Sequence, residues 1–345
     1  MGVLPYAHLD YGLEVKSMLK YIVQRLLIMV PALIVISMVS FLIIQLPPGD
    51  WLTSYATRLQ AQGVAVTESE LAGLEKRYGL GQPVYTQYLK WMWGILHGDF
   101  GQSFFWGQEV SALIWERLGL TVTLSLSTLL FIWIVAFPIG ILSAVRQYSL
   151  ADYVFTFLGF IGLAVPNFLL ALVFMYISFR YLGQSVGGLF SPGVQEAAWS
   201  WAKVKDLAAH LWIPIVILGL GGTAGLIRIM RANLLDEMHK PYVVAARARG
   251  LGERKLLFRY PVRVALNPFV STVGWTLPGL VSGSTIVARV LNLPMAGPLL
   301  LRALMDQDMY LAGSFIFMLS ALTLIGTLIS DVLLAWLDPR IRFGR

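Results

Sequence analysis

The composition places this chain among membrane proteins. Its 345 residues are 57% hydrophobic and only 13% charged, a balance that excludes an ordinary soluble domain. The net charge of +7 does not indicate a nucleic-acid partner, because the basic residues gather between long apolar runs, where they set membrane topology. The chain has no cysteine, which excludes disulfides and thiolate metal sites.

The first apolar run predicts a retained membrane anchor. It is longer than the core of a signal peptide and lacks a small-residue cleavage site. Basic residues flank its start, so we expect residues 1–18 to be a cytoplasmic segment and residues 19–46 to be the first transmembrane helix. The sequence leaves open whether Met1 or Met18 is the true start.

Residues 47–116 predict an extracytoplasmic insertion. A Pro-Pro-Gly-Asp run ends the first span at its start. Two short helices are expected, over residues 68–78 and 82–96. The second is rich in aromatic side chains, which suit the level where bilayer meets water.

The rest of the chain predicts a five-helix transmembrane core over residues 117–337 and a cytoplasmic tail over residues 338–345. We expect Pro166 to kink the third span and Pro278-Gly279 to interrupt the fifth. Six spans place both termini in the cytoplasm, so the predicted fold is an all-α polytopic membrane protein. The five later spans are expected over residues 121–145, 153–182, 207–229, 269–291 and 311–337.

A basic stretch between the fourth and fifth spans predicts a cytoplasmic elbow, over residues 233–266. Pro241 suits the first turn of a helix, and Gly250 is placed to end that helix in a left-handed conformation. A second helix over residues 252–260 stops at Pro261 and reaches only about 14 Å, too short to cross a bilayer. Four residues share one face of the first helix and offer a small, flat surface to a partner: Tyr242, Ala245, Ala246 and Arg249. The alternative is a basic loop that only sets topology.

The chain carries no catalytic set, so we expect it not to be an enzyme. Its four histidines are far apart in sequence, and it lacks a phosphate-binding P-loop, so no metal or ATP site is expected in this chain. Gly221 and Gly225 suit close helix packing. Asp331 lies inside the sixth span, where an ionisable group marks a functional site, or where it reaches the interface or pairs with a tail arginine.

The elbow resembles the coupling motif of ABC importer permeases, in the form typical of the peptide/nickel permease family. The resemblance rests on an Ala-Ala pair with a Gly four residues after the second Ala, followed by the run from Arg263 to Pro268. Weaker similarities, in order, cover residues 19–345. The resemblance implies that seven residues couple the chain to an ATPase: Tyr242, Ala245, Ala246, Arg247, Arg249, Gly250 and Leu251.

The resemblance also implies a fold, a function and partners. The fold is that of a type I ABC importer permease, in a bacterial inner membrane. The chain would form half of a translocation pathway for peptides or a related small solute, beside a second permease. Two ATPase subunits would hold ATP and magnesium, and an extracytoplasmic binding protein would deliver the solute. The interrupted fifth span suggests that the pathway is lined by Trp275, Pro278, Gly279, Ser282 and Ser284.

Several positions depart from the family pattern and leave the substrate open among peptides, nickel chelates, opines and oligosaccharides. Val244 stands where the general motif has Glu. Relatives usually carry an acid, Phe and Gly where this chain has Ala288, Leu291 and Met295, and an Asp-Tyr-Pro run where it has Asp308-Met309-Tyr310. The rival functions are a standalone secondary carrier or channel, which would be expected to carry more ionisable groups in its spans, and an intramembrane protease.

Overall fold

The computed structural model describes residues 11–45, 73, 82–103, 105–182, 187–306 and 308–337. Within some helices only the backbone is described, chiefly over residues 11–19, 271–278 and 280–283. The described part is built of helices: α1 (Tyr11–Gln45), α4 (Val84–Leu96), α5 (Val110–Val145), α6 (Leu150–Ala164), α7 (Asn167–Ile177), the π-helix η1 (Ser178–Leu182), α8 (Trp201–Met238), α9 (Pro241–Ala248), α10 (Glu253–Arg259), α11 (Pro261–Ala265), α12 (Asn267–Val290), α13 (Ala296–Met305) and α14 (Met309–Leu337).

The membrane character of the chain is confirmed. Among the described residues, α1, α5, α8 and α14 are long and apolar enough to cross a bilayer, and α6 with α7 makes a fifth span if the bent pair crosses once. The expected span over residues 269–291 coincides with α12, many of whose side chains lie outside the described ones. The count of six spans therefore stays a prediction. The expected helix over residues 82–96 is found as α4, whereas that over residues 68–78 lies outside the described residues.

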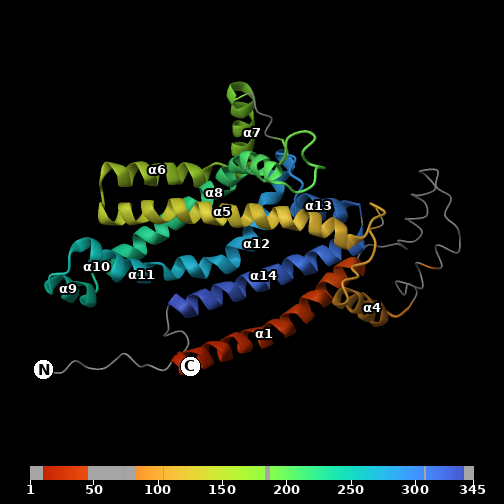
Figure 1. Ribbon diagram of the computed structural model, residues 1–345, viewed down its shortest axis with the longest axis horizontal. Helices are drawn as coiled ribbons and strands as arrows, with labels where there is room; N and C mark the ends of the chain where they lie inside the picture. Colours follow the sequence, from red (N-terminus) through yellow and green to blue (C-terminus); the bar gives the residue numbers. More distant parts are fainter. Residues whose placement is uncertain are drawn as a thin grey trace. The chain divides into compact units, whose positions relative to one another are not determined.

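The third expected span is two helices rather than one kinked helix. The axes of α6 and α7 meet at 103°, and α7 turns away from α6 (Figure 1). Val165 (ψ 123°) and Pro166 (ψ 136°) are both extended. A proline disfavours helical conformation in the residue before it and donates no helical hydrogen bond, so the chain leaves the helix there.

The predicted interruption of the fifth span is wrong. The backbone of α12 stays helical through Pro278 and Gly279. One proline removes a single helical hydrogen bond, and a long helix can absorb the resulting bend. Pro31, Pro138 and Pro214 likewise lie inside α1, α5 and α8.

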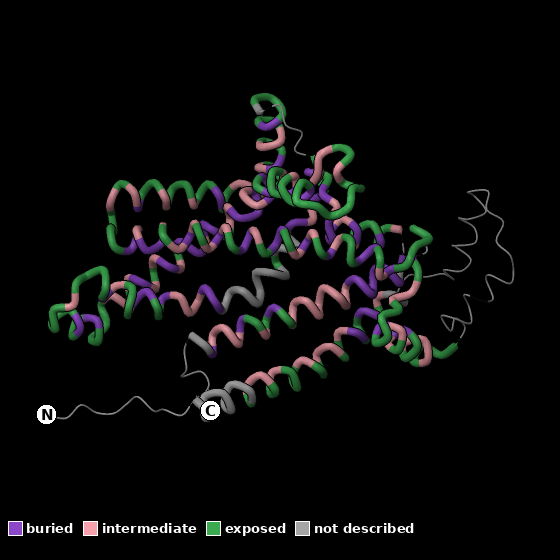
Figure 2. The backbone as a smooth tube through the Cα atoms, viewed as in Figure 1, coloured by how far each residue is buried: buried purple, intermediate pink, exposed green. Residues whose placement is uncertain are grey.

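The helices form two compact units, and α1, α5 and α14 contribute to both. Unit 1 comprises residues up to 27, residues 122–294 and residues from 323 on. Its core joins α5, α8, α11 and the start of α12, with Met230, Leu234 and Phe269 fully enclosed. In Figure 2 the buried positions follow α5 and α8, whereas α6 is largely exposed.

Small residues bring the helices of unit 1 together. A Cβ on Gly219 would lie 2.6 Å from the Phe131 ring of α5, and one on Gly162 would lie 3.4 Å from the Leu220 carbonyl. Gly221 faces Gly162 of α6, as expected of a packing position, whereas Gly225 faces open space.

An ion pair inside unit 1 explains the acid in the last span. Asp331 of α14 lies 3.2 Å from Arg25 of α1. The expected tail arginines lie outside the described residues, and the partner found is on the first helix. A charge inside a membrane span is costly unless it is paired, and Arg25 supplies the partner.

Unit 2 comprises residues 28–121 and 295–322. The buried Asp308 accepts hydrogen bonds from the Ser103 hydroxyl, the Phe105 N–H (3.1 Å) and the Leu311 N–H (3.3 Å). It therefore caps the start of α14 and fixes the loop after α4. Asp308, which this chain shares with the Asp-Tyr-Pro run of the family, therefore has a structural role.

Candidate functional site

The elbow is two short helices joined by a Schellman turn. Gly250 has a φ of +78°, its N–H donates to the Arg247 carbonyl (2.9 Å), and the Leu251 N–H donates to the Ala246 carbonyl (3.4 Å). These two bonds satisfy carbonyls that the end of α9 would leave unpaired. The predicted helix start at Pro241 and left-handed end at Gly250 are confirmed.

The interior of the elbow is a small apolar cluster. Val243, Ala246 and Leu256 are buried together, and Leu251 and Tyr260 pack against them. Because Leu251 follows the left-handed glycine and touches Ala246, the cluster includes the hydrophobic contact that often accompanies a Schellman turn.

The predicted flat Ala pair is divided between two faces of α9. Ala246 points inward and is only 7% exposed, whereas Ala245 points outward. On a helix of 3.6 residues per turn, Val243 and Ala246 share the inner face, and consecutive residues cannot both lie there. The outer face is formed by Val244, Ala245 and Ala248.

Two polar contacts brace the elbow. The Tyr242 hydroxyl donates to Glu237 at the end of α8, and burial, together with this carboxylate, raises the pKa of the Tyr242 hydroxyl. Arg247 donates to both oxygens of Glu253 (2.7 and 3.2 Å), which raises the pKa of the guanidinium and lowers that of the carboxyl. Arg247 is therefore paired within the elbow, and its contact with a partner stays a prediction.

The elbow is tied to the core of unit 1 on both sides. After the break at Tyr260 (φ −120°, ψ −79°), Val262 and Ala265 of α11 are buried in the same cluster as Met230 of α8 and Ile141 of α5. Rigid, packed connections transmit displacement, because a dense core leaves little room to yield. The elbow is thus joined through α11 to the packed core formed by α5, α8 and the start of α12.

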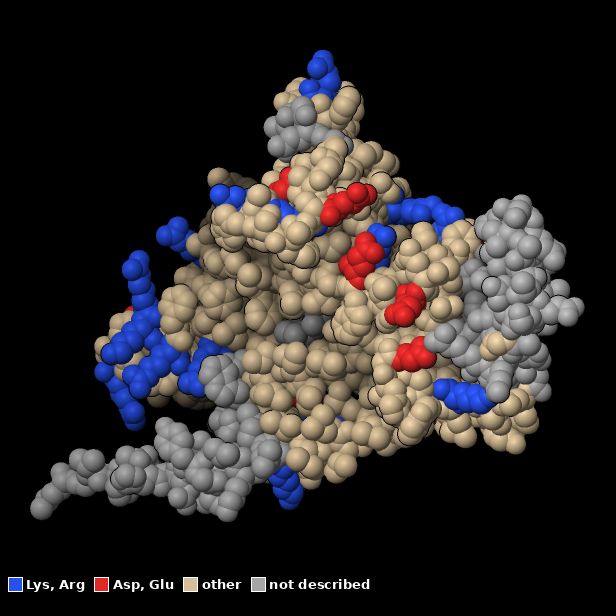
Figure 3. All heavy atoms as spheres, turned by 45° about the vertical axis from the view of Figure 1, so that its right-hand side comes forward, with Lys and Arg blue, Asp and Glu red and all other residues tan. Residues whose placement is uncertain are grey.

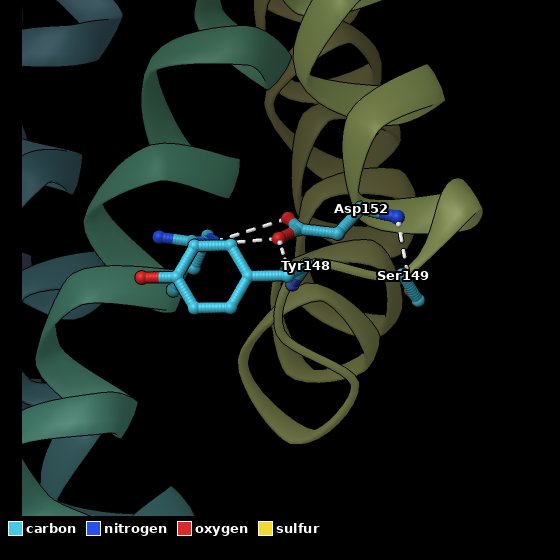
Figure 4. A network of polar contacts seen from close by, with 4 residues as sticks. Tyr148, Ser149 and Asp152 are labelled. Atoms are coloured by element: carbon cyan, nitrogen blue, oxygen red, sulfur yellow. Dashed lines mark hydrogen bonds and ion pairs between the residues drawn. The ribbon is translucent and has the colours of Figure 1, made fainter.

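The base of α8 is also braced by a polar network at the turn between α5 and α6. Arg231 donates to both oxygens of Asp152 (3.0 Å each), and Asp152 also accepts the Tyr148 N–H at 3.0 Å (Figure 4). The Ser149 hydroxyl caps α6 by accepting the Asp152 N–H. Tyr148 is held at a φ of 60°, rare for a residue with a side chain.

The outer surface of the elbow is basic. Lys and Arg side chains gather over the end of unit 1 that carries α9 and α10 (Figure 3). Arg249 is exposed there, and Phe258 adds an exposed ring. The arrangement can hold a partner by apolar contact on the outer face of α9 and by charge around it.

The pathway candidates on α12 are only partly described. Gly279 is exposed and a Cβ there would meet nothing within 4 Å, whereas Ser284 is buried at 3% exposure. Within this chain Ser284 therefore faces protein. The side chains of Trp275, Pro278 and Ser282 lie outside the described ones, so their role stays a prediction.

The departures near the end of α12 are packing residues. Ala288 and Leu291 are buried in unit 1, and Met295 is buried in unit 2. Asn292 ends α12 at a φ of 51°, where the Leu293 N–H donates to the Ala288 carbonyl (2.7 Å). The side chains of Ala288, Leu291 and Met295 therefore contact protein rather than solvent.

Sequence reasoning missed Val243, Leu256 and Tyr260 as the interior of the elbow, and Glu237 and Glu253 as its polar braces. The three-residue spacing from Val243 to Ala246 was an available signal for the inner face. The pairing of Arg247 with Glu253 spans the turn, and no helical spacing predicts it.

Comparisons with known proteins agree with this geometry. The family model described as the binding-protein-dependent transport system inner membrane component matches residues 136–343, and its N-terminal counterpart matches residues 18–126. The oligopeptide transport system permease protein AppB of Bacillus subtilis is 34% identical over 327 residues, covering 94% of this chain and 100% of AppB. OppB of Haemophilus influenzae, also an oligopeptide transport system permease protein, is 29% identical with the same coverage.

A solved structure shows a similar fold. The MetNI methionine ABC transporter, in an inward-facing conformation, superposes with a TM-score of 0.50 and 17% sequence identity. The match covers 66% of this chain and 96% of that chain.

Proposed function

The chain belongs to the family of inner-membrane components of binding-protein-dependent transport systems, which makes it a permease subunit of an ABC importer, and we propose that its elbow couples ATP hydrolysis to transport. The elbow would seat the outer face of α9 in a recess of an ATPase subunit. ATP and magnesium would be held by that ATPase and not by this chain.

The observation that carries this proposal is the double attachment of the elbow. Its outer face, Val244, Ala245 and Ala248, is small and apolar, which permits close approach of a partner. Its inner side is locked by the Schellman turn and by α11, which is packed into the α5–α8 core. Closure of an ATPase pair would therefore move whole helices rather than bend a loop.

The remaining partners and the topology follow from family membership as proposals. This chain would form half of a pathway with a second permease, and a solute-binding protein would deliver cargo from outside. Both termini and the elbow would be cytoplasmic, and residues 47–116 extracytoplasmic. The basic flanks of the spans support this orientation.

The proposed cargo is a peptide. AppB and OppB are both named for oligopeptide transport, and each aligns with this chain over its full length. A standalone carrier or channel would need no ATPase. The capped and anchored elbow supports the importer instead.

A substitution on the outer face of the elbow tests the proposal. Ala245 is exposed, so Ala245→Asp adds a charge without burying it and should leave the chain folded and paired with the second permease. We expect it to lose ATPase subunits during purification of the complex and to lose peptide uptake in vesicles. Ala245→Ser, which stays small and neutral, is the matched control. Normal uptake with Ala245→Asp would rule out docking on this face.

A further inference from the structure

A cation on α8 lacks the counter-charge that its neighbour has. Arg231 is paired with Asp152, but Arg228, one turn away, is exposed and makes no ion pair within the part of the chain that the structure describes. Its guanidinium carbon instead lies 5.1 Å from the centre of the Phe160 ring on α6. A cation over an aromatic ring keeps its full charge and remains able to bind an anion.

Arg228 lies in the part of α8 that leads to the elbow. Asp152 lies in the first turn of α6, directly after the polar turn that joins it to α5 (Figure 4). Arg228 precedes Arg231 by three residues, or roughly 4.5 Å along the helix. An arginine side chain near the polar end of a membrane helix can reach the interface while its stem stays among apolar groups.

The surface around Arg228 is apolar. Phe157 and Phe160 on α6 are 65% and 53% exposed, and Ile161 beside them is exposed. A Cβ on Gly225, one turn before Arg228, would meet nothing within 4 Å, so α8 has neither a side chain nor a close neighbour at this position. A cation at the edge of an exposed aromatic surface matches a molecule with an anionic head and an apolar tail.

We propose that Arg228 and Phe160 bind an anionic phospholipid, with the phosphate at the guanidinium and an acyl chain along α6. Arg146, exposed in the turn between α5 and α6, adds positive charge at the same end of the helices. Anionic lipids should bind here more tightly than zwitterionic lipids, because their headgroups carry no positive charge that offsets the phosphate. Each basic residue near a bilayer surface is worth about 1 kcal/mol towards anionic lipid.

Lipid retention by the purified importer complex tests the proposal. Native mass spectrometry would count phosphatidylglycerol and phosphatidylcholine retained from mixed vesicles. We expect Arg228→Gln to lower the preference for phosphatidylglycerol about fivefold, the ratio that corresponds to 1 kcal/mol, and Arg228→Lys to keep most of it. The matched control is Arg254→Gln, which removes the same charge from an exposed position on the elbow. Phe160→Ala, which changes no charge, should also lower retention.

Four outcomes would overturn the proposal. The first is unchanged retention in Arg228→Gln, or in Phe160→Ala if the arginine variant does not accumulate. The second is an equal loss in Arg254→Gln, which would indicate non-specific charge. The third is dissociation of the second permease from Arg228→Gln, which would make the cation a subunit contact. The fourth is loss of uptake with lipid retention intact, which would assign Arg228 to the transported solute. Because retention is measured without transport, this test does not depend on the proposed coupling role.

Discussion

The left-handed turn at Gly250 gives the sharpest test of coupling by the elbow. Its φ is +78°, and a Cβ placed there would meet no atom within 4 Å. Replacement by alanine therefore costs backbone strain alone, roughly 1–2 kcal/mol for a residue with a side chain. A cost of this size lowers the equilibrium constant between the intact and the opened turn about 5- to 30-fold.

Gly252 is the matched control for Gly250. It lies two residues on, also faces open space, and has a φ of −61°, which any residue adopts. As the cap of α10 it can be replaced by serine, a preferred capping residue, with no expected loss. Gly250→Asn should lose less ATPase binding and uptake than Gly250→Ala, because asparagine tolerates the left-handed region. Gly250→Val should lose the most of both.

The assay measures two quantities on the reconstituted complex: ATPase subunits retained after dilution, and peptide uptake driven by ATP. We expect both to fall for Gly250→Ala if docking requires the intact turn, by at most about 5- to 30-fold. The chain should still insert and pair with the second permease. Equal effects of Gly250→Ala and Gly252→Ser, or normal uptake with Gly250→Val, would refute the reasoning, since a loop that only sets topology is indifferent to φ.

Three further outcomes are expected. Single cysteines at Gln62, outside the described residues, and at Gly252 should label from opposite sides of the membrane, and labelling of both from outside would contradict the topology. Ala246→Asp buries an unpaired charge, so limited proteolysis should cut its elbow faster than that of wild type. The lowered pKa of Glu253 means that its pair with Arg247 is complete above the carboxyl's ordinary value of 4.5 and is lost only as pH falls through the lowered pKa. Protease resistance of the elbow should therefore not change between about pH 5 and 8, and a change there would count against this ion pair.

Local sequence determined the elements of this protein. The apolar runs predicted the long helices, and Pro241, Gly250 and Pro261 set the bounds of the elbow within a residue or two. These features depend on backbone chemistry and helix spacing, which act over a few neighbouring residues. The coupling motif could be recognised in the sequence for the same reason, since the residues that form the turn lie together in the chain.

Tertiary contacts decided the rest. Spacing placed Ala245 and Ala246 together, but only the packing of Leu256 from the next helix shows which of them is buried. Composition marked Asp331 as unusual, and its partner Arg25 is at the other end of the chain. Arg228 and Arg231 look alike in sequence, and the difference between them is a single carboxylate brought from α6. Partners distant in sequence are set by how helices pack, and no local pattern encodes that packing.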